Sequence, residues 1–314
     1  MSGKILVTPR SLTAHPHPAF AHFEAQGFEI VLGPAGKQPD EAALLSLIPD
    51  CIGWIAGVEP VSEAVIAAAG SLRAVARNGV GTDNLPVAHL RARGIPVLTA
   101  DGANAAGVAE LALTLILSAL RHVPAADAGI KAGHWPRRRG RELRAATVGV
   151  IGCGAIGRDV AKLTGALGAR VIGYDPMRPN FESPHDFRWA EIPALLADSD
   201  IVTLHCPPPA DGRPLIDAEH LAIMRHGAIL VNTARAGLVD EAAVLAAIES
   251  GQLDTYAADV FAEEPPRSLA LAGHPHVIAT SHIGAFTEES VDRATVIAVQ
   301  NLLAALQGDH ARPV

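Results

Sequence analysis

Short apolar runs rich in Ile and Val alternate with Ala- and Leu-rich stretches along the first hundred residues, which is typical of βα units around a parallel sheet. These runs cover residues 5–8, 29–32, 52–56, 73–76 and 97–99. A second series of apolar runs covers residues 147–151, 170–174, 201–204, 228–232, 256–260 and 277–280. Because parallel strands are buried beneath helices on both faces, each series predicts its own doubly wound sheet, the second with six strands.

Two long helical stretches frame the second series. Residues 104–121 are apolar nearly all round, which predicts burial on more than one side, between domains or between subunits. The arginine-rich stretch at residues 134–144 contains a proline and predicts an exposed connection. The helix expected at residues 288–306 is left over once the second sheet is complete, so we expect it to pack against the first domain. The pattern therefore predicts one domain of residues 1–99 and 283–314, interrupted by a second domain of residues 100–282.

Composition narrows the class of partner. The chain has 314 residues, 49% apolar and 18% charged, which excludes a disordered or fibrous chain and suggests about two domains. Aromatic residues make up only 4%, so Ala, Val, Leu and Ile must fill the cores. A formal net charge of -8 argues against nucleic acid and against an anionic membrane as the main partner. We therefore expect a small-molecule partner.

Cysteine usage and the N-terminus predict the compartment. Cys51, Cys153 and Cys206 lie far apart without a C-x-x-C pair, so we expect no metal site, no disulfide framework and a reducing compartment. The N-terminus enters an apolar run at once and lacks the pattern of a signal peptide. The longest apolar stretch, residues 108–120, is too short to span a bilayer. These features predict a cytoplasmic protein.

A glycine motif indicates a dinucleotide site in the second domain. Gly152, Gly154 and Gly157 stand in G-x-G-x-x-G register between an apolar run and an Ala/Leu-rich helix. In that motif the first glycine permits a tight turn, the second lets backbone N–H groups approach a pyrophosphate, and the third lets the helix pack closely. Asp175 ends the next apolar run, where a carboxylate can accept hydrogen bonds from ribose hydroxyls and repel a 2′-phosphate. We therefore expect NAD, while Arg178 leaves NADP open; the alternative is a plain turn with Asp175 as a cap.

Three further segments resemble those of the D-isomer-specific 2-hydroxyacid dehydrogenase family, in particular its phosphoglycerate dehydrogenase-like branch. They read ILVNTARAGLVDE at residues 229–241, ADVFAEEP at 258–265 and ATSHIGA at 279–285. The segments RAVARNGVGTDN at 73–84 and GANAAGVAE at 102–110 are also similar to the family's. The resemblance implies a Rossmann NAD-binding domain inserted into a discontinuous flavodoxin-like substrate domain, and a homodimer. It also implies hydride transfer between NAD(H) and a D-2-hydroxy acid or 2-keto acid.

The resemblance assigns three catalytic side chains. Arg235 would bind the substrate carboxylate with its planar guanidinium and polarise the C2 oxygen. His282 would exchange a proton with the 2-hydroxyl, and Glu264 would hold the second ring nitrogen. The alternatives are a surface ion pair for Arg235, a solvated carboxylate for Glu264 and a histidine bonded to backbone for His282. Small residues depart from the family pattern beside them, at Ala236, Ser281 and Ala285.

The resemblance also implies binding residues around this centre. The substrate would be bound by Arg77, Asn78, Gly79, Val80, Gly81 and Asn104. The cofactor contacts, besides the three glycines and Asp175, would be Ala155, Ile156, Pro207, Thr233, Ala234, Asp259 and Gly284. Asp259 is expected to meet the nicotinamide carboxamide, and Asn104 has the alternative role of a plain helix cap.

The sequence does not decide which 2-hydroxy acid or 2-keto acid is the substrate. Arg77 and the Tyr174-Asp175-Pro176 sequence are similar to the phosphoglycerate dehydrogenase branch, which makes 3-phosphoglycerate one candidate, with Arg77 on its phosphate. One of the arginines at 137–139 is a further candidate phosphate ligand, although the favoured interpretation of that cluster is a solvated connection. Reduction of glyoxylate or hydroxypyruvate is an equally serious alternative. An alternative of another class is a non-catalytic NAD-dependent binding or corepressor-like protein.

Overall fold

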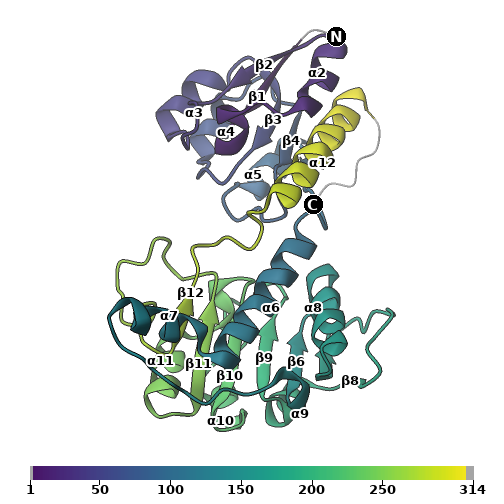
Figure 1. The fold of residues 1–314 in the computed structure, drawn as a ribbon. Coiled ribbons are helices and arrows are strands. Elements are labelled where there is room, and N and C mark those ends of the chain that lie inside the picture. The colour runs from purple at the N-terminus through teal and green to yellow at the C-terminus, as the bar shows by residue number, and fades with distance from the viewer. Residues whose placement is uncertain (1–2, 309–314) are drawn as a thin grey trace. The chain divides into compact units, whose positions relative to one another are not determined.

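The computed structural model describes residues 3–308, which divide into two α/β units (Figure 1). The first unit comprises residues up to 104 and from 287 onward, and the second comprises residues 105–286. The second unit is therefore inserted into the first, and both contain a parallel sheet. This arrangement confirms the predicted fold class. The unit boundaries fall a few residues after the predicted domain limits at 99 and 282.

The first unit is built on a five-stranded parallel sheet in the order β2-β1-β3-β4-β5. Its strands are β1 (Gly3–Val7), β2 (Phe28–Leu32), β3 (Cys51–Ala56), β4 (Ala74–Arg77) and β5 (Val97–Leu98). Its helical elements are α1 (Arg10–Ala14), η1 (Pro18–Phe20), α2 (Ala21–Ala25), α3 (Glu41–Leu47), α4 (Glu63–Ala68), α5 (Val87–Ala92) and α12 (Glu288–Gln307). The strand order is that of flavodoxin-like sheets, in which the winding direction reverses between β1 and β3.

The C-terminal helix α12 completes the core of the first unit. It packs against β3 and β4, as Figure 1 shows, and buries Val299, Leu302 and Leu306 against Ile5 and neighbouring apolar residues. A separate core around Trp54 covers the other face of the sheet. Because both faces are covered, the strands need continuous apolar sequence, which is the pattern that the chain shows.

The second unit is built on a seven-stranded parallel sheet in the order β12-β11-β10-β9-β6-β7-β8. Its strands are β6 (Thr147–Ile151), β7 (Arg170–Tyr174), β8 (Phe187–Trp189), β9 (Ile201–Leu204), β10 (Ala228–Asn232), β11 (Leu253–Ala258) and β12 (Val277–Ala279). Its helical elements are α6 (Ala105–Arg121), α7 (Val123–Lys131), η2 (Leu143–Ala145), α8 (Ala155–Ala166), α9 (Ile192–Asp198), α10 (Ala218–Ile223), η3 (Ala236–Leu238) and α11 (Glu241–Glu249).

The expectation of six strands in this sheet was wrong, because β8 adds an edge strand beside β7. The strand has three residues, too few to show a period. Its place is fixed by edge-to-face packing of Phe187 on Trp189 and on Phe181, with ring centroids 4.9 and 5.2 Å apart. A Cβ on Gly173 of β7 would lie 2.7 Å from the Phe187 ring, so the glycine makes room for this aromatic cluster.

Helices α6 and α7 differ in burial. Helix α6 buries nine of its 17 residues, whereas α7 has no buried residue.

In the part of the chain that the structure describes, no single helix is long and apolar enough to cross a membrane. Helices α6 and α7 reach the required length and apolar composition only when they are counted together, and the chain bends by 65° between them.

Candidate functional site

The three glycines of the turn between β6 and α8 have three different surroundings. Gly152 has φ +89°, and a Cβ there would lie 2.6 Å from the His205 carbonyl. A Cβ on Gly157 would lie 1.9 Å from the Gly152 oxygen, so this glycine lets α8 approach the turn. A Cβ on Gly154 would meet nothing within 4 Å. The exposed backbone at Gly154 and Ala155 therefore forms the open side of the turn, where an anion can reach the N–H groups of a helix start.

The Asp175 carboxylate lies beside this turn. Its oxygens accept hydrogen bonds from the N–H groups of Cys153 and Met177, each at 2.9 Å. These bonds hold the carboxylate at the end of β7, and it remains half-buried. Arg178, the residue that left NADP open, forms an ion pair with Glu191 at 2.6 Å, with both side chains more than half exposed.

Two residues near the turn, Cys153 and His205, are uncharged. Burial raises the pKa of the Cys153 thiol to about 12, which keeps it protonated, as a small packing residue. Burial lowers the pKa of His205 to about 3, so its ring is neutral, and its Nε2 lies 2.8 Å from the Thr203 hydroxyl. Pro207 follows on the exposed loop. Among the described residues, no group of three or more His, Cys, Asp or Glu side chains could hold a metal ion.

The turn after β10 places Arg235. The fully buried Asn232 side chain shapes this turn, accepting the Ala234 N–H at 3.1 Å and donating to the Arg235 carbonyl at 2.9 Å. The Arg235 guanidinium donates to the Ala234 carbonyl at 2.8 Å. The buried Thr233 hydroxyl has no hydrogen-bond partner among the described residues, so it is available to a ligand. Sequence reasoning missed Asn232, although an Asn at a strand end is a common turn-forming signal.

His282 and Glu264 form a direct pair. The His282 Nδ1 lies 2.8 Å from Glu264 Oε2, and Glu264 Oε1 accepts the Phe261 N–H at 3.1 Å. The His282 side chain is 52% exposed, which leaves the other ring nitrogen accessible. His282 follows β12, Glu264 follows β11 and Arg235 follows β10, so all three come after the carboxyl ends of neighbouring strands. Ligands bind at such edges in open α/β sheets.

Asp259 holds the loop that carries His282. Its carboxylate, 1% exposed, accepts the Thr280 hydroxyl at 2.6 Å, the Ile283 N–H at 2.9 Å and the Gly284 N–H at 2.8 Å. These donors lie on both sides of His282, whose φ of +55° is uncommon for a residue with a side chain. The family resemblance implied a contact between Asp259 and the nicotinamide carboxamide, and nothing in the sequence pattern signals this positioning role. A Cβ on Gly284 would lie 3.0 Å from Asp259 Oδ2, so a larger residue there would push against this carboxylate.

The predicted substrate loop lies in the first unit, after β4. The N–H groups of Asn78 and Gly79 donate to backbone carbonyls, whereas those of Val80 and Gly81 donate no hydrogen bond within residues 3–308. These two N–H groups are therefore the ones that can receive an anion. Arg77 is only 8% exposed and its Nη1 donates to the Asn78 carbonyl at 2.7 Å, so this side chain supports the loop from within. Asn104 is half-buried and directly precedes α6.

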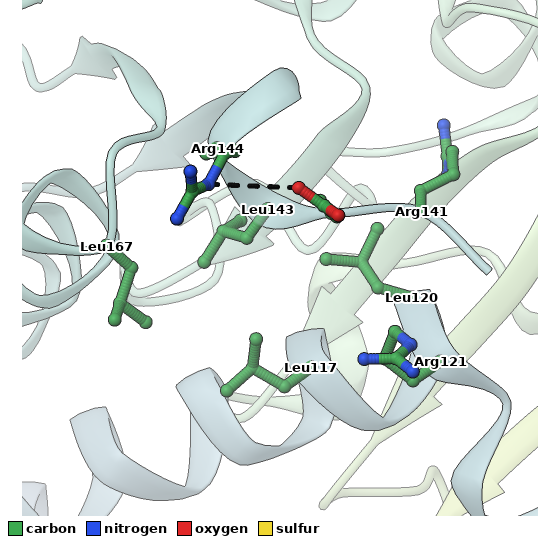
Figure 2. A pocket seen from close by; sticks show the side chains of 8 residues that line it. Leu117, Leu120, Arg121, Arg141, Leu143, Arg144 and Leu167 are labelled. Carbon is green, nitrogen blue, oxygen red and sulfur yellow. Dashed lines mark ion pairs between the residues drawn. The ribbon is translucent and has the colours of Figure 1, made fainter.

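A hollow in the second unit contains none of the predicted site residues. Its volume is about 450 Å³, and it lies between the end of α6 and residues 141–144 (Figure 2). Leu117 and Leu167 line it, and both are more than a third exposed. Arg144 pairs with Glu142 at 3.8 Å on its wall. The hollow therefore lies outside the cofactor and catalytic residues and is a partly apolar surface feature.

Comparison with known proteins adds three findings. Residues 113–284 match the model of the NAD binding domain of D-isomer specific 2-hydroxyacid dehydrogenases. The D-3-phosphoglycerate dehydrogenase of Methanocaldococcus jannaschii is 41% identical over 81% of this chain and 49% of its own length. The hydroxypyruvate reductase of Thermotoga maritima is 37% identical over 82% of this chain and 86% of its own length. A solved glyoxylate reductase from Paecilomyes thermophila has a TM-score of 0.85 and 26% identity, over 100% of this chain and 98% of that one.

The matched lengths differ between these relatives. The chain spans about half the length of the D-3-phosphoglycerate dehydrogenases that it matches, and most of the length of the hydroxypyruvate reductase.

Proposed function

Because the chain belongs to the D-isomer specific 2-hydroxyacid dehydrogenase family, we propose that it transfers a hydride between NAD(H) and a D-2-hydroxy acid or its 2-keto acid. The observation that carries this proposal is the Glu264–His282 pair at 2.8 Å, at the same sheet edge as Arg235. The residues present fit the cofactor, since Gly154 leaves open space at the start of α8 and the buried Thr233 hydroxyl has no protein partner among the described residues. Bound NAD would accept or supply the hydride.

The side chains divide the remaining chemistry. Glu264 holds His282 Nδ1, which leaves Nε2 to take the hydroxyl proton in oxidation and to return it in reduction. The carboxylate of Glu264 also stabilises the imidazolium that forms when the ring carries this proton. Arg235 offers a planar pair of donors to the substrate carboxylate. We further propose that the loop of Val80 and Gly81 binds a carboxylate oxygen of the substrate through the N–H groups of these two residues.

For the substrate we propose a small 2-keto acid without phosphate, such as hydroxypyruvate or glyoxylate. Arg77, the predicted phosphate ligand, is buried and donates to the carbonyls of Asn78 at 2.7 Å and Ala56 at 3.5 Å. Because the Arg77 side chain is only 8% exposed, it presents little surface to a phosphate. The 37% identity to a hydroxypyruvate reductase supports the same choice. The 41% identity to a D-3-phosphoglycerate dehydrogenase makes phosphoglycerate the competing substrate.

A screen of 2-keto acids tests this proposal. The chain is mixed with NADH or NADPH and with hydroxypyruvate, glyoxylate or 3-phosphohydroxypyruvate, and the nicotinamide absorbance is followed. We expect oxidation of NADH by an unphosphorylated acid. Turnover with the phosphorylated acid alone would overturn the substrate, and a preference for NADPH would overturn the cofactor. Absence of turnover with every acid would favour the non-catalytic NAD-dependent binding protein.

We also propose that the chain is a homodimer that uses the surface of α7 and the segment after it. Val123 and Ile130 on α7 and Trp135 beyond it are each more than half exposed. A Cβ on Gly129 would lie 2.5 Å from the Pro136 ring, so the following segment packs along the helix and presents its apolar residues beside it. A second copy of the chain is the occupant that this apolar surface suits. The cytoplasmic location remains a prediction from cysteine usage.

A further inference from the structure

A buried carboxylate lies at the carboxyl ends of β1 and β3 in the first unit. Glu59 is 1% exposed, and its Oε1 accepts the Gly57 N–H at 2.9 Å. The Thr8 hydroxyl donates to the same oxygen, and it accepts a hydrogen bond from Trp54 Nε1 at 2.9 Å. The donors run in one direction, from indole through hydroxyl to carboxylate. Burial of a carboxylate is costly unless hydrogen bonds compensate it, and here Thr8 and Gly57 both donate to Oε1.

The position of this network in the sheet is informative. The order β2-β1-β3-β4-β5 reverses its winding between β1 and β3, and open α/β sheets bind ligands at the carboxyl ends flanking such a reversal. Here the chain places its own carboxylate at that point. A Cβ on Gly57 would lie 2.5 Å from Glu59 Oε2, so the loop closes tightly around the side chain.

Hydrogen bonds join residues 56–61 to the predicted substrate loop at residues 78–84. Asn84 Nδ2 donates to the carbonyls of Gly57 at 3.0 Å and Glu59 at 2.7 Å, and the Val61 N–H donates to the Asn84 carbonyl at 3.0 Å. At the other end of the substrate loop, the Asn78 N–H donates to the Ala56 carbonyl at 2.9 Å. The segment from 78 to 84 is therefore attached at both ends to residues 56–61, whose shape depends on the Glu59 carboxylate.

We propose that Glu59 is a positioning residue for substrate binding, acting through Asn84 on the loop that contains the free N–H groups of Val80 and Gly81. This inference rests on the proposed function. The carboxylate fixes residues 57–61, these residues hold the Asn84 end of the substrate loop, and the two N–H groups are thereby kept in place for the carboxylate of the 2-keto acid. Preorganised donors bind an anion without an ordering cost at the moment of binding.

Steady-state kinetics of Glu59→Ala and Glu59→Gln test the proposal. We expect Glu59→Ala to raise KM for the 2-keto acid about 10-fold, with kcat and KM for NADH within about two-fold, because ground-state binding is what the loop supplies. Glu59→Gln should stay close to the parent chain, since its amide oxygen can still accept from Gly57 and Thr8. Asn84→Ala should raise KM for the 2-keto acid in the same way while the buried Glu59 carboxylate stays in place. This variant therefore tests the proposal even if Glu59→Ala does not fold.

Thr13→Val is the matched control in the same unit. Thr13 is also buried, and its hydroxyl bonds the carbonyls of Arg10 at 3.1 Å and Pro34 at 3.2 Å, with no bond to the substrate loop. We expect this variant to lower Tm while KM stays unchanged. If Thr13→Val raised KM as much as Glu59→Ala, or if neither Glu59→Ala nor Asn84→Ala raised KM, the positioning role would be wrong.

Hydrogen exchange separates this inference from the proposed activity. In peptides that cover residues 78–84, the hydrogen-bonded N–H groups of Asn78 and Gly79 should exchange faster in Glu59→Ala and Asn84→Ala than in the parent chain, whereas in Thr13→Val they should exchange at the parent rate. This measurement needs no turnover, so it decides the positioning role even if every 2-keto acid fails. Equal exchange rates in all four proteins would overturn it.

Discussion

At the scale of single residues, the site depends on side chains that hold the backbone in uncommon conformations. His282 has φ +55°, a conformation that costs a non-glycine residue of order 1–3 kcal/mol. The three hydrogen bonds to Asp259 on either side of it offset this cost. Asp259 therefore fixes the backbone around His282, and Glu264 fixes its imidazole ring. The proposed proton exchange with a substrate would then need no reorganisation of the loop.

The first prediction concerns His282→Ala. We expect turnover to fall at least 10²-fold, because the acid/base group is lost, while the dissociation constant for NAD stays nearly unchanged. Steady-state kinetics and NAD titration measure the two quantities. His276→Ala is the control, since His276 precedes β12 and bonds the Asp254 carbonyl, at the opposite end of the strand. Near-normal turnover in His282→Ala would remove this residue from the mechanism.

The second prediction separates two glycines of one motif. Gly154→Ala adds a methyl group where nothing lies within 4 Å and φ is -68°, so the free energy of unfolding should change by less than about 1 kcal/mol. Its methyl group should nevertheless weaken NAD binding by obstructing the pyrophosphate. Gly157→Ala should lower both stability and NAD affinity, because its Cβ would lie 1.9 Å from a backbone oxygen. Urea denaturation and NAD titration check both variants, and equal stability losses would contradict the prediction.

At the scale of elements, α12 is the clearest case of a helix whose role depends on where the chain returns. Its polar residues reach the segment after β5, with Arg293 Nε donating to the Ala103 carbonyl and Asn301 Nδ2 to the Thr99 carbonyl. Its Thr295 hydroxyl donates to Asn78 Oδ1 at 3.3 Å. The helix therefore supports both the core and the substrate loop of the first unit, although it follows the whole second unit in the sequence.

The third prediction concerns the apolar side of α12. Leu302→Ala should lower the free energy of unfolding of the first unit by about 2–5 kcal/mol, because the side chain is fully buried and the cavity cannot close completely. Leu302 packs beside Gly53 of β3, where a Cβ would lie 3.2 Å from its Cδ2. Urea denaturation monitored by circular dichroism measures the loss. Gln300→Ala, exposed on the same helix, should change stability by less than about 0.5 kcal/mol, and a similar loss in both variants would contradict the packing argument.

At the scale of the whole molecule, the proposed dimer accounts for apolar residues that the fold leaves exposed. Helix α7 buries no residue, and Trp135 just beyond it is 80% exposed. Val123 and Ile130 lie on this helix, and Trp135 lies on the segment that packs along it. Exposed apolar patches mark association surfaces. The hollow between α6 and residues 141–144 adds Leu117 and Leu167 to the apolar surface of the same unit (Figure 2).

The fourth prediction tests this surface. Light scattering of the parent chain at micromolar concentration should give the mass of a dimer, and Ile130→Glu should shift it toward the monomer. A charge in the centre of an apolar interface is costly to bury, which is the reason for the shift. Met177→Glu is the control, because Met177 is 84% exposed and lies outside this surface. A monomeric parent chain, or equal effects of the two variants, would contradict the dimer.

The sequence by itself determined the features that depend on local pattern. Strand positions such as 147–151 and 201–204 were predicted to the residue, because a buried parallel strand needs a continuous apolar run between turns. The Gly-rich turn was equally readable, because its three glycines stand in a fixed register between an apolar run and a helical stretch. The roles of Arg235, Glu264 and His282 came from family resemblance and stay predictions until tested, while the structure gives them one sheet edge and one direct pair.

Tertiary structure decided what joins distant parts of the chain. The edge strand β8 depends on aromatic rings packing across a loop, and the Asp259 bonds span more than 20 residues. The Glu59 network joins Thr8 to a residue 51 positions away, and no period or motif announces it. Hydrogen bonds of this kind depend on which strand ends are neighbours in the sheet. The sequence pattern could locate the strands along the chain, but the order of the strands in the sheet follows from the folded topology. Only the structure therefore showed which side chains lie together at the strand ends.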